Sequence, residues 1–489
     1  MEFDSSFFEI ALSLLGVKAL VCAENLNVHK FSLLTIGGDN IVIKISEQVN
    51  RVLEILRQNG HTAYVVGGAC RDMFMGREIH DWDVATSARP EETVSAFEGY
   101  RVIETGIKHG TVTVLVDSEP IEITTYRTES GYSDNRHPDS VEFTAKIEDD
   151  LSRRDFTVNA IAYSPLLGTV DPFDGRGDAE RKIIRCVGNP DTRFNEDGLR
   201  ILRALRFASV LGFDIEPETS ASIKRNKELL KNISVERIFE ETTKLLCGVN
   251  AAKILDEYYD VFFFIFPELE AMKGCTQHHE RHIYDVWGHT LKVLESIEPQ
   301  AELRWTAMLH DSGKPAHKTT DEKGIDHFYR HAYKSRDIAN DILLRMKTSN
   351  AFRKSVCTLV EHHDFLPDKI SKKTYRKFIA QYGAETVNKL FKIREADIQG
   401  QNPVYINEGL ASNSAGLETL AQIEAEDSCF TIKDLDINGK DLIGIGVPRQ
   451  HIMSEILEIL LDEVMDDRLE NKKQALLHRA KELMKGKDL

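Results

Sequence analysis

The sequence contains little cysteine, and its seven cysteines form no CxxC pair. This scarcity excludes the disulfide framework of small secreted domains and favours a reducing compartment. No run of 18 apolar residues occurs, which argues against a membrane-spanning helix. The apolar N-terminal stretch follows Glu2 and Asp4 and lacks the basic start of a secretory signal. These absences together predict a cytoplasmic protein that does not associate with a membrane.

The chain also lacks an excess of basic residues, because its formal net charge is -17. An acidic average argues against non-specific nucleic-acid binding through bulk charge, although a local basic face remains open. A hydrophobic content of 42% and a charged content of 29% are typical of a soluble globular protein. No internal repeat or low-complexity tract is present, and 489 residues allow three or four domains.

The first stretch with recognisable chemistry is YVVGGACRDMFMGREIHDWD, residues 64–83. It predicts a strand, a glycine turn ending at Gly68, a short helix with Arg71, and a second strand with Asp81 and Asp83. Carboxylates two residues apart on a strand face the same side, and they repel each other unless a cation lies between them. Such oxygen ligands suit Mg²⁺. The pattern predicts a metal-dependent phosphoryl- or nucleotidyl-transfer site, and an acidic loop at a strand end is the alternative.

Two later segments carry groups that suit the same site. The strand IEITTYRTE places Glu122 where it can face the side of the two aspartates and complete a two-metal cage, the alternative being a solvated strand residue. The polar, turn-rich segment 129–145 predicts a mobile loop. After it, a predicted helix carries Arg153, Arg154 and Asp155 near its start. Adjacent arginines beside a metal site are suited to hold a triphosphate.

The segment NEDGLRILRALRFASVLGF predicts a strong helix. Asp197, Arg200, Arg203 and Arg206 recur every three residues and form a polar row opposite the apolar face. An aspartate and an arginine together can offer acceptor and donor groups to the Watson–Crick edge of a base. Residues 151–206 hold 10 Lys/Arg against 8 Asp/Glu, which favours an anion site in an acidic chain. An exposed salt-bridged stripe is the alternative.

Histidines concentrate in the second half of the chain. Adjacent His and Asp at a helix end, with a further His and a distant Asp on other helices, can ligate a divalent metal in a helical bundle. Surface or core histidines without a ligand role are the alternative. The main candidates are His289, His310, Asp311 and Asp397, and the additional ones are His331 and either His362 or His363.

The motifs GGACRDMFMGREIHDWD, RRDFTVNAIAY and EDGLRILRALRFASVLGF occur in this order. With them, the sequence resembles the class II tRNA nucleotidyltransferases, the CCA-adding enzymes of the polymerase-β-like nucleotidyltransferase superfamily. The histidine series resembles the His-Asp (HD) phosphohydrolase domain that some members carry, with HDSGK in place of the common HDIGK. The resemblance covers most of 46–489. Bacterial poly(A) polymerases share the three motifs, but ETGIKHGTVTVLV is more similar to the CCA-adding version.

The resemblance implies an α+β fold, in which a mixed-sheet nucleotidyltransferase head precedes an all-α neck, an HD-type body and a tail. The expected parts are an N-terminal extension of unknown role (1–45), the catalytic head (46–170), the helical neck with the base-recognition helix (171–270), the HD-type metal-binding domain (271–400) and the C-terminal tRNA-binding tail (401–489).

The implied function is template-independent addition of the 3′-terminal CCA to tRNA from CTP and ATP by two-metal nucleotidyl transfer, with an added HD phosphohydrolase activity. The alternatives are an enzyme that adds only A or only C, a poly(A) polymerase, a protein that is mainly an HD phosphohydrolase, or a non-catalytic RNA-binding module. A second divalent metal (Mn, Ni, Mg or Fe) is expected in the HD domain. The residues implied at the head site are Asp81, Asp83 and Glu122 for catalysis and Mg²⁺, and Gly68, Arg71, Arg154, Asp155, Asp197, Arg200, Arg203 and Arg206 for the nucleotide.

Overall fold

The chain divides into two compact units, Met1–Ser234 and Val235–Leu489. The division falls within the range 171–270 that the sequence predicts as one helical neck, and the finer five-part division stays a prediction. The computed structural model describes residues 32–36, 39–43, 45–79, 81–132, 139–364, 371–425, 431–448 and 451–485. Most of the expected N-terminal extension therefore lies outside the described residues.

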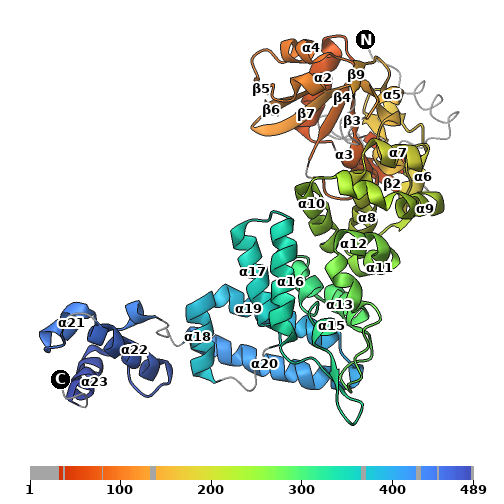
Figure 1. Ribbon diagram of the computed structural model, residues 1–489. Helices are drawn as coiled ribbons and strands as arrows, with labels where there is room; N and C mark the ends of the chain where they lie inside the picture. The colour runs from red at the N-terminus through yellow and green to blue at the C-terminus, as the bar shows by residue number, and fades with distance from the viewer. Residues whose placement is uncertain are drawn as a thin grey trace. The chain divides into compact units, whose positions relative to one another are not determined.

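A mixed seven-stranded sheet forms the centre of the first unit (Figure 1). Its neighbouring strands are antiparallel except for β4 and β7, which are parallel. This sheet, with helices in both units, confirms the α+β class. In sheet order the strands are β11 (Gly168–Val170), β10 (Ala162–Ser164), β3 (Ala63–Val66), β4 (Asp83–Thr86), β7 (Glu119–Thr125), β6 (Thr111–Val116) and β5 (Arg101–Ile103).

The helix α2 (Glu47–Gln58) shows why this unit folds as the sequence predicts. The Ser46 hydroxyl accepts a hydrogen bond from the Val49 amide at 3.2 Å and caps the first turn. The buried residues of α2 repeat at helical spacing and pack with one face of the sheet. The other helices of the unit are α3 (Gly67–Phe74), α4 (Pro90–Ala96), η1 (Ile107–His109), α5 (Ile147–Ser152), η2 (Thr157–Asn159), α6 (Gly175–Glu180), α7 (Pro190–Glu196), α8 (Leu199–Leu211), α9 (Pro217–Asn226) and η3 (Lys227–Asn232).

Four shorter strand pairs lie outside the main sheet. β1 (Ser32–Ile36) and β2 (Asp39–Ile43) are antiparallel, and β12 (Ile183–Ile184) is parallel to β13 (Asp214–Ile215). β8 (Arg127–Ser130) and β9 (Ser140–Phe143) form an antiparallel pair within and beside the predicted mobile loop 129–145. The loop prediction was therefore wrong for the paired residues, while 133–138 lie outside the described residues. In the second unit, β14 (Thr319–Thr320) pairs with β15 (Asp326–His327).

Apart from the β14–β15 pair, the second unit is built of helices in its described part. Trp287 and Trp305 are among its fully buried side chains. None of the helices within the described ranges combines the length and the hydrophobicity that a bilayer crossing requires. The helices are α10 (Val235–Leu246), α11 (Ala251–Glu257), α12 (Tyr259–Ile265), η4 (Pro267–Met272), α13 (Val286–Ser296), α14 (Ala301–Leu309), α15 (Lys314–His317), α16 (His331–Arg345), α17 (Asn350–Glu361), α18 (Lys372–Tyr382), α19 (Ala384–Gln399), α20 (Pro403–Ala425), η6 (Ile432–Asp434), α21 (Gly439–Gly444), α22 (His451–Met465) and α23 (Lys473–Lys485).

Candidate active site and metal centre

Three carboxylates of the first unit gather at the start of β4. Asp83 is the first residue of β4 and pairs in register with Glu122 of the parallel strand β7. Register partners on neighbouring strands face the same side of a sheet. Asp81 is exposed and precedes β4, so the prediction that it lies on the strand was wrong. The strand starts late because β3 turns into α3 after Val66 and leaves no partner opposite Asp81.

The charges around Asp83 create a place for a cation. Partial withdrawal from water raises the pKa of the Asp83 carboxyl, and the nearby carboxylates Glu122 and Asp81 raise this pKa further, whereas Arg154 lowers it. Like charges this close destabilise the ionised form unless a cation lies between them. Carboxylate oxygens are the ligands that Mg²⁺ prefers. The donor set therefore fits one or more divalent ions.

Gly67 lets Arg154 approach these carboxylates. It is the first residue of α3 and has φ +70°, a conformation that glycine adopts without strain. A Cβ at this position would lie 2.9 Å from Nη1 of Arg154 and 3.7 Å from Oδ2 of Asp83. The neighbouring Gly68 faces the guanidinium of Arg71, which a Cβ at Gly68 would meet at 3.6 to 4.0 Å. The pair of glycines thus places backbone beside two arginines.

Arg153, Arg154 and Asp155 follow the end of α5, so the predicted position near a helix start was wrong. The reason is Asp150 in the last turn of α5. Its carboxylate accepts hydrogen bonds from Arg153 at 2.8 Å and from Arg154 at 3.2 Å, and these bonds hold both arginines against the helix end. Burial raises the pKa of Asp150, but Arg153 and Arg154 outweigh this effect and lower it overall. Sequence reasoning missed Asp150, although its spacing of three and four residues was a signal.

Asp155 connects this segment to α8. Its Oδ2 accepts two hydrogen bonds from Arg203, at 2.8 Å from Nε and 2.5 Å from Nη2. Its Oδ1 accepts from the Phe156 amide at 2.9 Å and from Asn159 at 3.2 Å. Burial raises the pKa of the Asp155 carboxyl, but Arg203 and Arg200 outweigh it and bring the pKa down to about 2. The carboxylate is therefore ionised and fixes the orientation of Arg203.

Asp197 and Arg200 lie close together but not on one continuous helix. Asp197 ends α7 in an extended conformation, and α8 begins at Leu199, so the single predicted helix is broken. Oδ1 of Asp197 accepts from the Leu199 amide at 3.0 Å, a bond that satisfies a free donor at the start of α8. Arg200 donates to Glu196 at 2.5 Å and to the Arg153 carbonyl at 3.2 Å. The predicted base-reading arginine is thus tied to the predicted triphosphate segment.

Two remaining predicted residues, Arg71 and Arg206, lie near the same part of α8. Arg71 is buried and donates to Oδ1 of Asn159 at 2.7 Å, and Asn159 is a residue that sequence reasoning missed. Both arginines lie over the ring of Phe207. The first unit therefore brings together all the nucleotide-binding residues that the sequence predicts through a continuous set of contacts.

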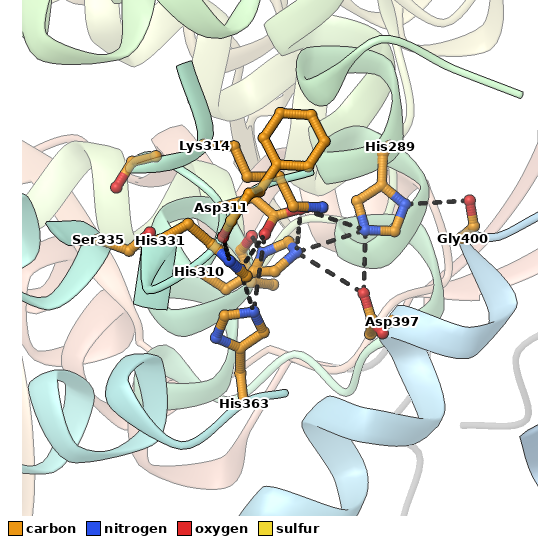
Figure 2. Close-up of polar contacts among 12 residues, drawn as sticks. His289, His310, Asp311, Lys314, His331, Ser335, His363, Asp397 and Gly400 are labelled. Carbon is orange, nitrogen blue, oxygen red and sulfur yellow. Dashed lines mark hydrogen bonds and ion pairs between the residues drawn. The ribbon is translucent and has the colours of Figure 1, made fainter. Parts of the chain in front are cut away.

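In the second unit, the predicted histidines form a buried cluster of two groups (Figure 2). The first group is His289 of α13, His310 at the end of α14 and Asp397 of α19. Nε2 of His289 lies 3.0 Å from Oδ1 of Asp397 and 3.4 Å from Nε2 of His310. Nδ1 of His289 lies 3.1 Å from the carbonyl oxygen of Gly400, which orients the ring.

The second group is Asp311, His331 and His363. Oδ1 of Asp311 lies 3.2 Å from Nε2 of His331 and 3.6 Å from Nε2 of His363. Its other oxygen, Oδ2, lies 3.2 Å from Nε2 of His310. Asp311 therefore faces both groups (Figure 2). His362, the other histidine considered from the sequence, points elsewhere and lies 3.0 Å from the Tyr382 hydroxyl.

The surroundings of the cluster keep Asp311 ionised. Burial raises the pKa of its carboxyl, but His310 and Lys314 outweigh burial and hold the pKa well below its ordinary value. Nζ of Lys314 lies 2.7 Å from Oδ2 of Asp311. Ser312, which replaces the usual apolar residue of the motif, donates to the Leu309 carbonyl at 2.8 Å and so leaves the site intact. The cluster opens into a cavity of about 370 Å³.

Family models match three parts of the chain. Residues 63–185 match the "Poly A polymerase head domain", and residues 212–273 match the "Probable RNA and SrmB- binding site of polymerase A". Residues 317–480 match a model of domain 2 of tRNA nucleotidyltransferases. The mixed-sheet head and these matches define the protein as a nucleotidyltransferase.

Relatives specify the family more closely. A CCA-adding enzyme of Ligilactobacillus salivarius is 37% identical over 445 residues, which cover 89% of this chain and 96% of the relative. A CCA-adding enzyme of Pediococcus pentosaceus is 34% identical over 440 residues, 90% of this chain and 98% of the relative. The crystal structure of the Bacillus stearothermophilus CCA-adding enzyme in complex with CTP matches with a TM-score of 0.68 and 29% identity, covering 90% of this chain and 98% of that one. The chain belongs to the CCA-adding enzymes, which confirms the resemblance to that family.

Proposed function

We propose that this protein adds the 3′-terminal CCA to tRNA from CTP and ATP by two-metal nucleotidyl transfer. The observation that carries the proposal is the convergence of Asp81, Asp83 and Glu122 beside Arg154 in the first unit. Among similar structures, the Bacillus stearothermophilus enzyme was solved with CTP and a Thermotoga maritima enzyme of the same fold with tRNA_CCA. The partners proposed for this chain are accordingly tRNA, CTP and ATP.

The carboxylates and arginines take separate roles in the proposed reaction. Asp81 and Asp83 would hold Mg²⁺, and Glu122 adds a third carboxylate beside Asp83. Bound there, two Mg²⁺ ions supply activation of the tRNA 3′-hydroxyl and neutralisation of the triphosphate and leaving pyrophosphate. Arg154 would hold the triphosphate from the side of Gly67. Asp155, proposed to lie near the ribose, keeps Arg203 in place.

Base selection is assigned to Asp197 and Arg200. An aspartate offers acceptors and an arginine offers donors, so together they can distinguish the Watson–Crick edges of C and A from those of U and G. The bonds of Arg200 to Glu196 and to the Arg153 carbonyl restrict its guanidinium to one orientation. Protein side chains would then take the place of a nucleic-acid template.

The test of the catalytic assignment is Asp81→Ala. The side chain is exposed, so its loss leaves the core unchanged, whereas it removes a proposed Mg²⁺ ligand. We expect incorporation of CTP and ATP into a tRNA that lacks CCA to fall by more than 1,000-fold, measured with labelled nucleotides. Glu98→Gln, another exposed acid of this unit, is the control and should keep wild-type activity. Near-normal incorporation by Asp81→Ala would overturn the assignment.

A second function, a metal-dependent phosphohydrolase, is favoured by the six-residue cluster of the second unit. Two groups of nitrogen and oxygen ligands with a shared aspartate fit a pair of divalent ions of the Mn, Fe, Ni or Mg class. Bound there, the ions supply a nucleophilic hydroxide near neutral pH. The proposed ligands are His289, His310, Asp311, His331, His363 and Asp397, and His362 is left out because it contacts Tyr382.

The neighbouring histidines His362 and His363 provide a matched test of this second function. We expect metal analysis of the wild type, loaded with Mn²⁺ and desalted, to give at least two ions per chain, those of the second-unit cluster. His363→Ala should lose at least one ion and most hydrolysis of bis(p-nitrophenyl) phosphate or p-nitrophenyl phosphate, because it loses a ligand beside Asp311. His362→Ala should keep both properties. Equal metal content and hydrolysis in the two variants would contradict the proposed ligand set.

A further inference from the structure

Three arginines, one from α3 and two from α8, lie over one phenyl ring, that of Phe207. The guanidinium carbon of Arg206 is 3.9 Å from the ring centroid, and those of Arg71 and Arg203 are each 5.4 Å from it. All three distances are within the range of an attractive cation–π contact. Phe207 therefore links the arginine of α3 to the two arginines of α8.

The ring is itself held rigidly. Phe207 is only 7% exposed, and its ring meets the ring of Phe156 edge to face, with centroids 5.7 Å apart and an interplanar angle of 78°. Phe156 directly follows Asp155, the carboxylate that binds Arg203. The platform is thus fixed to the same segment that anchors one of its arginines.

The chemistry of the guanidinium explains why an aromatic ring suits this position. Arg71 already donates to the carboxylate of Asp72, and Arg203 donates to that of Asp155. Any further carboxylate would use up more N–H donors, because each such bond occupies one. A ring attracts the face of a guanidinium and occupies none of its N–H groups. Attraction by the ring therefore orients the arginines without consuming the donors that an anionic ligand needs.

We propose that Phe207 is a positioning residue for the incoming nucleotide, acting through Arg71, Arg203 and Arg206. The proposal rests on the proposed role of these arginines in nucleotide binding. A phenylalanine that only fills the core would contribute to stability alone. A positioning residue must also affect the Michaelis constant for the nucleotides, and its effect must depend on the aromatic face rather than on side-chain volume.

The experiment compares Phe207→Leu with Phe207→Tyr in steady-state CCA addition. Leucine keeps an apolar side chain but removes the ring face, so we expect KM for CTP and for ATP to rise about tenfold. The KM for tRNA should stay within twofold of wild type, and kcat should change less than the nucleotide KM. Phe207→Tyr keeps the ring and should restore the nucleotide KM to within threefold. Phe213→Leu is the control for a lost ring, because Phe213 is buried in the same unit and no described arginine lies over its ring.

The outcomes separate this proposal from the one on which it rests. A folded Phe207→Leu protein with wild-type nucleotide KM would overturn the positioning role, and so would equal impairment of the Leu and Tyr variants. If Phe207→Leu does not fold, Phe207→Met replaces it in the same comparison. Arg206→Ala is measured alongside. An unchanged nucleotide KM in that variant would instead contradict the nucleotide-binding role of the arginines.

Discussion

Asp155 shows how a single buried charge organises the proposed nucleotide site. Its carboxylate is 8% exposed and accepts hydrogen bonds from Arg203, Asn159 and the Phe156 amide. A buried carboxylate without such partners would take up a proton, whereas here its pKa is about 2, with Arg203 and Arg200 outweighing the effect of burial. The same bonds that keep Asp155 ionised hold Arg203 toward the ring of Phe207.

This lowered pKa predicts a pH-dependent contribution to stability. The carboxyl binds a proton less readily in the folded protein than in the unfolded chain, where its pKa is about 3.9. Its ionised form therefore stabilises the fold fully above about pH 4, and the contribution is lost as the pH falls through 4 toward 2. From the two pKa values we expect about 2.6 kcal/mol at pH 7 and about half of that at pH 3.

The measurement compares urea unfolding of the wild type and Asp155→Asn at both pH values. Trp82 is the only tryptophan of the first unit, so a Trp287→Phe/Trp305→Phe background reports on that unit alone. The difference in unfolding free energy between the two proteins should shrink by about 1 kcal/mol from pH 7 to pH 3. A difference that stays constant with pH would show that the Asp155 carboxylate is not held in its ionised form by the fold.

Single residues were predicted from the sequence where their chemistry is distinctive and local. The carboxylates and arginines of the three motifs, and the histidines of the cluster, carry groups with few alternative uses. Asp150 and Asn159 were missed because a buried acid or amide that supports an arginine has no signature of its own in the sequence. The choice between His362 and His363 was open because adjacent residues point in different directions, and only the end of α17 determines which one faces Asp311.

At the scale of elements, the junction of β3 and α3 determines the geometry of the proposed catalytic site. The chain passes from strand to helix at Gly67 with φ +70°, and Arg154 occupies the space where a side chain would lie. The short turn also leaves the start of β4 accessible, and Asp83 lies there beside Glu122 of β7. Gly67 is therefore required for two reasons: its backbone has a positive φ, and a side chain there would collide with Arg154.

Gly67→Ala is predicted to impair nucleotide addition far more than it impairs folding. The new Cβ would approach Nη1 of Arg154 to 2.9 Å and displace the guanidinium from the carboxylates, so we expect at least a tenfold loss of kcat/KM for CTP. Gly76→Ala is the control, because Gly76 also has a positive φ (64°) but nothing within 4 Å of its Cβ position. Both variants carry the backbone strain of about 1 kcal/mol, so their melting temperatures should be similar. Equal activity of the two variants would refute a specific role for Gly67.

Helices and strands were predicted well where a local sequence pattern determines them. They were predicted less well where strand pairing or helix capping determines where an element begins or ends. The helix α2 follows from its cap at Ser46 and the spacing of its apolar residues. The break between α7 and α8 was missed because the apolar pattern continues through it, while Asp197 ends α7 and accepts a hydrogen bond from the first amide of α8. The β8–β9 pair was missed because β8 is entirely polar and β9 has only four residues, so the short apolar alternation of Val141 and Phe143 is a weak signal within a polar segment.

At the scale of the whole molecule, the two candidate sites lie in separate compact units. The carboxylate and arginine site, residues 67–207, lies within Met1–Ser234, and the histidine cluster, residues 289–397, lies within Val235–Leu489. The mixed sheet and the family were correctly predicted from the three motifs and their order. Where the chain divides could not be predicted, because the helical pattern runs without a break from 217 to 272 and only three-dimensional contacts show that a unit ends at Ser234.

The central claim is that one chain completes the whole CCA sequence, and the identity of the product tests it most directly. Purified protein is incubated with Mg²⁺ and a tRNA that ends at the discriminator base, with each nucleotide alone and with CTP and ATP together, and the 3′ ends are sequenced. We predict CC with CTP alone and a single CCA with both nucleotides, because the proposed base selection by Asp197 and Arg200 needs no nucleic-acid template. A product that stops at C residues, gains only A, or extends as poly(A) would contradict the account.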